Sequence, residues 1–168
     1  MKKYLIMPMI AAAMTLSATA VAKPNHAAKM SDGDKMVGIW QCHFADNDMR
    51  IQGYLNYQKD GTAHAVMKVD YLQAGKVTST NLSRNLLHWQ LSGDQLQSDD
   101  WQILDLKSYD ESGQPLGEEY AQLMRSIATQ NANITPQSTS RIQFIDNDTY
   151  HEILDEATGE YGLCHRQR

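Results

Sequence analysis

Two cysteines, each followed directly by a histidine, are the residues of this chain best suited to chemistry. They lie near its two ends, in Gly38-Ile39-Trp40-Gln41-Cys42-His43 and in Gly162-Leu163-Cys164-His165-Arg166. An even number of cysteines favours a disulfide in an exported chain. A zinc site built from both Cys-His pairs, or two free thiols, are the alternatives. Zinc ligands usually come as short-spaced pairs, whereas neighbours on a strand point to opposite faces. We therefore predict a Cys42–Cys164 disulfide and no metal site.

The predicted disulfide also predicts which strands pair. If the two segments are antiparallel neighbours, a step of two residues along each places Trp40 opposite Arg166. The first strand of a sheet is then joined to the last, and the sheet closes into a barrel whose interior is filled by side chains or holds a ligand. His43 and His165 fall on the face opposite the disulfide, where two solvated histidines are favoured over a shared metal ion.

No motif predicts a catalytic site. His151-Glu152 resembles the start of a zinc protease motif, but Asp155 stands where a second histidine is needed. The triplets Asp46-Asn47-Asp48 and Asp146-Asn147-Asp148 lack the glycine and distant glutamate of a calcium loop and suit hairpin turns instead. The sequence contains no serine-nucleophile elbow, phosphate-binding glycine loop or dinucleotide fingerprint. We expect neither enzyme activity nor a cofactor, unless distant strands assemble an active site.

The amino terminus and the net charge predict where the protein acts. Residues 1–22 combine a basic start, a short apolar run and a small-residue end at Ala20-Val21-Ala22, which are the three parts of a secretory signal. The run is too short to favour the alternative, a permanent membrane anchor. The net charge of −5 argues against nucleic acid and anionic membrane surfaces as partners. We predict a periplasmic or secreted protein with a signal peptide over 1–22, a flexible leader over 23–36 and a single domain over 37–168.

Apolar residues alternate with polar ones along most of the chain. Strands of this kind are separated by turn residues such as Asp60-Gly61 and Ser92-Gly93-Asp94. The segments are 50–58, 65–71, 77–82, 87–91, 141–145, 150–154 and 161–166, with a less regular one at 101–109. Short strands with frequent turn signals are typical of barrels and sandwiches. The pattern predicts a mostly β fold, an antiparallel barrel or clam of about eight strands.

One segment has a helical period instead. Its apolar side chains recur on one face at Tyr120, Leu123, Met124 and Ile127. Glu118 and Glu119 precede them, where the helix dipole favours acidic residues. We predict a single amphipathic helix of about three to four turns, followed by a polar loop over residues 130–139. Packing of the apolar stripe on the barrel, as a lid or plug, is favoured over a partner-binding role.

The chain resembles the lipocalin-like, or calycin, group of barrels. Gly38-Ile39-Trp40 resembles the Gly-x-Trp of the first strand of that group, and Arg166 resembles the arginine that packs across this tryptophan from the last strand. A cation over an indole face closes the end of such a barrel. The resemblance covers residues 37–166 in outline and implies a small bacterial periplasmic barrel. The main helix of lipocalins follows the eighth strand, whereas the helix expected here precedes the last strands.

The resemblance implies a non-enzymatic periplasmic protein that binds a small, largely apolar ligand. The alternation places four side chains on inner faces, where they would line a cavity: Tyr57, Met67, Tyr71 and Trp89. The alternative is that they fill a small barrel without a cavity. The second function considered is a protein-interaction module, such as a lysozyme-type inhibitor, an immunity factor or an accessory of envelope assembly, whose partner is another envelope protein. The sequence identifies neither the ligand nor the partner nor the oligomeric state.

Overall fold

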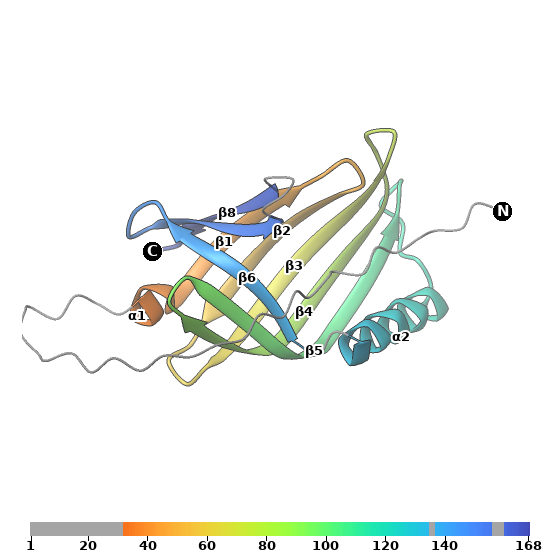
Figure 1. Cartoon of the computed structure of the whole chain (residues 1–168). Coiled ribbons are helices and arrows are strands. Elements are labelled where there is room, and N and C mark those ends of the chain that lie inside the picture. Colours follow the sequence, from red (N-terminus) through yellow and green to blue (C-terminus); the bar gives the residue numbers. More distant parts are fainter. Residues whose placement is uncertain (1–31, 135–136, 156–159) are drawn as a thin grey trace, which may run out of the picture.

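The structure, a computed structural model, describes residues 32–134, 137–155 and 160–168. Within these residues, eight antiparallel strands pair in chain order and close into a barrel (Figure 1), which confirms the predicted fold class. The elements are α1 (Asp32–Met36), β1 (Gly38–Ala45), β2 (Met49–Tyr57), β3 (Thr62–Gln73), β4 (Lys76–Ser92), β5 (Gln95–Asp110), α2 (Glu118–Ile134), β6 (Gln137–Phe144), β7 (Thr149–Asp155) and β8 (Glu160–Arg166). The predicted signal segment 1–22 and residues 23–31 of the predicted leader lie outside the described residues.

Aspartates shape the tight turns between the strands. The Asp46 carboxylate accepts hydrogen bonds from the backbone nitrogens of Asp48 and Met49, at 2.7 and 2.6 Å. Asp146 accepts one from the nitrogen of Asp148 at 2.8 Å in the same way. Short acidic side chains favour turns because they satisfy backbone donors locally. The acidic triplets therefore serve as turn formers at the β1–β2 and β6–β7 connections.

The longest strands differ from the sequence prediction. The segments 77–82 and 87–91 are parts of one strand, β4, which has 17 residues. β5 begins at Gln95 and pairs with β4 through two register shifts, near Arg84 and near His88. Asp100, beside the second shift, has a φ of +51°. A bulge inserts an extra residue and breaks the alternation of a strand, which explains the irregular pattern of residues 101–109.

Two helices are present in the described part of the chain, where one was predicted. α1 occupies residues 32–36, so the end of the predicted flexible leader is helical, and Met36 is fully buried in the core. α2 runs to Ile134, so the polar loop predicted from residue 130 is wrong over its first five residues. The predicted stripe is wrong at Leu123, which is 55% exposed. No helix of the described residues combines the length and apolar character needed to cross a membrane.

The main cluster of buried hydrophobic residues in the described structure lies at one end of the barrel, the end beside α1 (Figure 1). Its buried members are Met36, Trp40, Tyr57, Ala63, Ala65, Leu87, Leu96, Ile142, Tyr150 and Cys164. We call this end, where the β2–β3 and β4–β5 turns also lie, the closed half. The open half is the other end, with the β1–β2 and β3–β4 turns, and α2 packs beside it against β5. The difference between the halves decides where a ligand has room.

Candidate functional site

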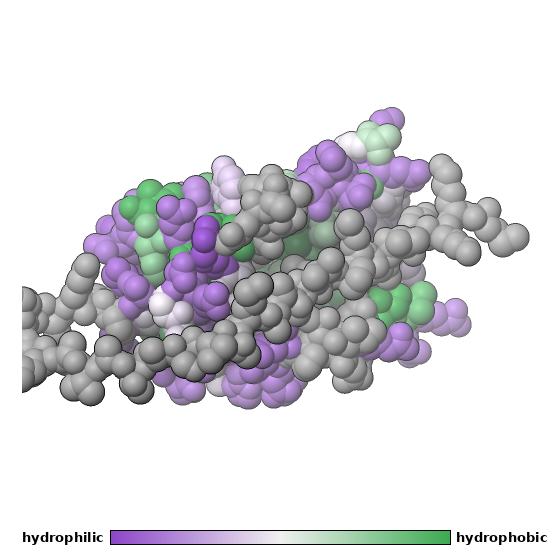
Figure 2. Space-filling model, viewed as in Figure 1, coloured by the Kyte–Doolittle hydropathy of each residue, from purple (hydrophilic) through white to green (hydrophobic). Residues whose placement is uncertain are grey.

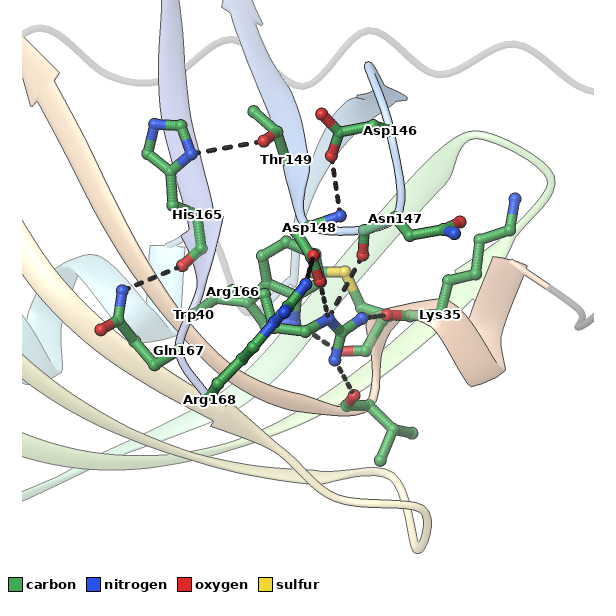
Figure 3. A network of polar contacts seen from close by, with 12 residues as sticks. Lys35, Trp40, Asp146, Asn147, Asp148, Thr149, His165, Arg166, Gln167 and Arg168 are labelled. Carbon is green, nitrogen blue, oxygen red and sulfur yellow. Dashed lines mark hydrogen bonds and ion pairs between the residues drawn. The ribbon is translucent and has the colours of Figure 1, made fainter.

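The closed half ends in a polar network centred on Arg166 (Figure 3). Trp40 lies opposite Arg166 on neighbouring strands, and the guanidinium carbon is 4.3 Å from the centroid of the fully buried indole ring. Arg166 donates hydrogen bonds to the carbonyls of Val37, at 2.7 Å, and Lys35. The Trp40 indole nitrogen donates to the Met36 carbonyl at 2.7 Å. The two side chains thus hold the end of α1 across the base of the barrel.

A glycine makes this contact sterically feasible. Gly38 has a φ of +130°, a conformation that side chains with a Cβ rarely adopt, and an added Cβ would lie 2.6 Å from Nη1 of Arg166. Gly38 therefore gives Arg166 the space to reach the Val37 carbonyl, and the Gly-x-Trp segment acts as one unit.

The predicted disulfide is present. Cys42 and Cys164 are register partners on β1 and β8, and the bond spans 122 residues of sequence. Both flanking histidines, His43 and His165, are exposed. Because the thiols are joined, the zinc and free-thiol alternatives are excluded. Among the described residues no group of three or more His, Cys, Asp or Glu side chains is arranged to hold a metal ion.

Two of the four residues predicted to bind ligand belong to the packed closed half. Tyr57 and Trp89 contact each other edge to face, with ring centroids 5.2 Å apart. The Trp89 indole nitrogen donates to the carbonyls of Gln58, at 3.1 Å, and Thr62, at 2.9 Å, and so fastens the β2–β3 turn. These contacts give Tyr57 and Trp89 a structural role. Their predicted role in binding stays a prediction.

A carboxyl group faces the barrel interior above the core. Glu152 on β7 accepts a hydrogen bond from the Ser140 hydroxyl at 2.7 Å. Burial raises the pKa of Glu152 above its ordinary value, and the bond from Ser140 only partly opposes this. Burial likewise raises the pKa of Tyr150, with contributions from Tyr57 and Glu152. In the sequence Glu152 stands out only as part of the rejected protease motif, and its inward position was not predicted.

The open half is not sealed by the sheet. β5 pairs with β6 only over residues 95–99, so residues 100–110 hydrogen-bond to β4 alone among the strands. A groove of about 540 Å³ lies where β1 and β8 separate, and Phe44 and Ile51 are among its lining residues. Figure 2 shows a recessed hydrophobic surface between β6 and β5. The wall of the barrel is therefore interrupted in this half.

Inward-facing residues of the open half form rows across neighbouring strands. The row nearest to the middle of the open half crosses β2, β3, β4 and β5. In it Ile51 is the register partner of Val69, Val69 of Asn81, and Asn81 of Ser108. On β3, Met67 lies two residues from Val69 toward the closed half, and Tyr71 lies two residues from Val69 toward the rim of the open half. Met67 and Tyr71, the other two residues predicted to bind ligand, therefore lie in the open half. Ile51, Met67, Val69 and Tyr71 are only half-buried although they point inward. Inward-facing apolar side chains that remain partly exposed indicate unfilled space.

Asn81 and Ser108 were not predicted as site residues. Asn81 is 6% and Ser108 is 2% exposed. The sequence could have indicated the inward position of Asn81. Asn81 is an even number of residues away from Leu87, Trp89 and Leu91, so in one continuous strand it lies on the same face as these apolar side chains. It was missed because residues 83–86 were not recognised as part of the strand.

Comparison of the chain with known protein families finds no match, and none of the curated proteins matches it either.

Proposed function

We propose that this protein is a lipocalin-like, non-enzymatic binding protein of the periplasm that holds a small, largely apolar ligand in the open half of its barrel. The observation that carries the proposal is the contrast between the two halves. Around Trp40 the inward side chains form a cluster of ten buried residues, whereas the apolar side chains around Val69, including Ile51 and Tyr71, are all half-buried. A well-packed interior leaves no such exposure. The disulfide supports the predicted oxidising compartment.

Binding of an uncharged apolar dye such as phenylnaphthylamine tests the proposal. The full chain with its disulfide intact is titrated with dye, and the rise in dye fluorescence is recorded. Val69→Phe adds bulk to the open half and is expected to weaken binding by at least about tenfold, since the space is shared with the dye. Val66→Phe is the matched control, because Val66 lies on the same strand but is 54% exposed. Equal binding by both variants, or no binding by the unmodified protein, would refute the proposal.

A further inference from the structure

Two buried polar atoms in the open half have no hydrogen-bond partner in the described structure, Oδ1 of Asn81 and Oγ of Ser108. The two residues are register partners on β4 and β5 and point into the barrel. The Asn81 side chain lies near Tyr71, where it opposes the burial that raises the pKa of that tyrosine. Buried polar atoms are nearly always paired, because an unpaired one loses its hydration without compensation. An adjacent pair of this kind, beside half-buried apolar side chains, is suited to binding a polar group of a ligand.

The surroundings of this pair decide the kind of polar group. Oδ1 of Asn81 is an acceptor, and the Ser108 hydroxyl either donates or accepts. Both atoms are satisfied by one group that carries a donor hydrogen. Among the described inward-facing residues of β2 to β5 in this half there is no lysine or arginine to neutralise an anion. Asp110, at the rim, directs its carboxylate to the Ser112 hydroxyl and to the nitrogen of Gln114. An uncharged donor therefore fits, and a carboxylate or phosphate does not.

The same row of residues supplies an apolar surface beside the polar pair. Val69 is the register partner of Asn81, and Ile51 is the register partner of Val69. One row across four strands is thus apolar on β2 and β3 and polar on β4 and β5. In the next row Gly53 contributes no side chain, and Met67 packs over it, with its Cγ 3.4 Å from where a Cβ would stand. A ligand with an apolar chain and one polar end matches this division.

We infer that the ligand is an amphipathic molecule with an uncharged hydrogen-bond-donating head, an alcohol or a carboxamide, which Asn81 and Ser108 bind while its apolar chain contacts Ile51 and Val69. The inference rests on the proposed function, since it specifies the ligand of the same site. It assigns binding roles to Asn81 and Ser108, which otherwise carry unsatisfied polar atoms in an apolar interior.

Two probes that differ in a single donor test the inference. Decanol and decyl methyl ether have similar apolar chains, but only decanol donates a hydrogen bond. Each displaces the bound dye from the unmodified protein, and their dissociation constants are compared. We expect decanol to bind about tenfold more tightly than the ether, the ratio that corresponds to one hydrogen bond to an otherwise unpaired buried group. Decanoate, which is charged, is expected to bind more weakly than decanol.

Three variants distinguish a binding role from a structural one. Asn81→Leu removes the acceptor of the alcohol hydrogen with little change of volume, and is expected to bring the ratio of the decanol and ether affinities to about one. Ser108→Ala removes a hydroxyl that donates to the oxygen of either probe, so it is expected to weaken the binding of both and to leave their ratio unchanged. The melting temperatures of both variants without ligand should equal or exceed that of the unmodified protein, because an unsatisfied buried group is lost. Ser92→Ala, at an exposed site at the far end of β4, should keep the ratio.

The outcomes separate this inference from the proposed function. Tight binding of both probes with equal affinity, or a ratio unchanged in Asn81→Leu, would overturn the inference and leave the proposed function standing. Failure of the dye and of every probe to bind would overturn both. If Asn81→Leu does not fold, the decision rests on Ser108→Ala, which removes a single oxygen atom, and an unchanged affinity of this variant for decanol would overturn the inference.

Discussion

The contact between Trp40 and Arg166 supports a quantitative prediction about the closed half. Replacement of Trp40 by leucine removes the ring beneath the guanidinium and the indole donor to the Met36 carbonyl. For a fully buried aromatic residue this loss should lower the free energy of unfolding by about 3 kcal/mol. Arg166→Ala removes the cation–π contact, about 0.5–2 kcal/mol, and leaves the Lys35 and Val37 carbonyls without their charged donor. We expect a loss of about 3 kcal/mol here as well.

The double variant is expected to be less destabilised than the sum of the single variants. Both substitutions remove the same ring–cation contact and both release the end of α1, so the coupling free energy should be about 1–2 kcal/mol. Urea unfolding of the oxidised protein, followed by far-ultraviolet circular dichroism, measures all four proteins without relying on tryptophan fluorescence. Arg168→Ala is the control, because Arg168 pairs with Asp148 while 84% of its side chain is exposed, and its loss should cost less than about 0.5 kcal/mol. Additivity within about 0.5 kcal/mol, or an Arg166→Ala effect no larger than that of the control, would refute the reasoning.

Three further predictions concern the frame around the site. Replacement of both Cys42 and Cys164 by alanine opens a loop spanning 122 residues and should lower the free energy of unfolding by about 5 kcal/mol, measured by denaturant unfolding; an unchanged midpoint would contradict this. Because burial raises the pKa of Glu152 above 4.5, the folded protein binds this proton more tightly than the unfolded chain, so its contribution to stability is present at low pH and is lost as the pH rises through the raised pKa. Glu152→Gln should therefore be more stable than the unmodified protein at pH 7, and its free energy of unfolding should depend less on pH in this range. A variant that is less stable at pH 7 and keeps the same pH dependence of the free energy of unfolding would exclude the explanation. Gly38→Ala should destabilise by about 2–3 kcal/mol, because it combines an unfavourable backbone conformation with a close approach to Arg166; a melting temperature within a degree of the unmodified protein would show that the segment adapts freely.

Local patterns in the sequence were sufficient for most of the strands and for the closure of the barrel. Alternation in segments such as 50–58 and 65–71 depends on which side chains are apolar, so it can be read without tertiary contacts. The disulfide was predictable because the chain has only two cysteines. Given that bond, the antiparallel geometry alone placed Trp40 opposite Arg166.

Other elements depend on contacts that local patterns do not encode. Residues 32–36 are too few to form a stable helix alone, and α1 is held by contacts of Met36, Lys35 and Val37 with Trp40 and Arg166. The bulge at Asp100 changes the inward parity of β5 partway along the strand. Leu123 lies at the correct helical spacing but points to solvent, because α2 contacts one edge of the barrel and not a broad surface.

The candidate site shows the same division between sequence and tertiary structure. The alternation in the sequence by itself determined that Met67 and Tyr71 share an inner face with Tyr57 and Trp89, because a strand has a period of two. It did not determine which of them has space beside it, since that depends on where the core is filled and where β5 separates from β6. Only the tertiary structure brought Asn81 and Ser108 together in one row with Ile51 and Val69. Register between strands is decided by the whole barrel, and it is register that turned isolated polar residues into a pair facing an apolar wall.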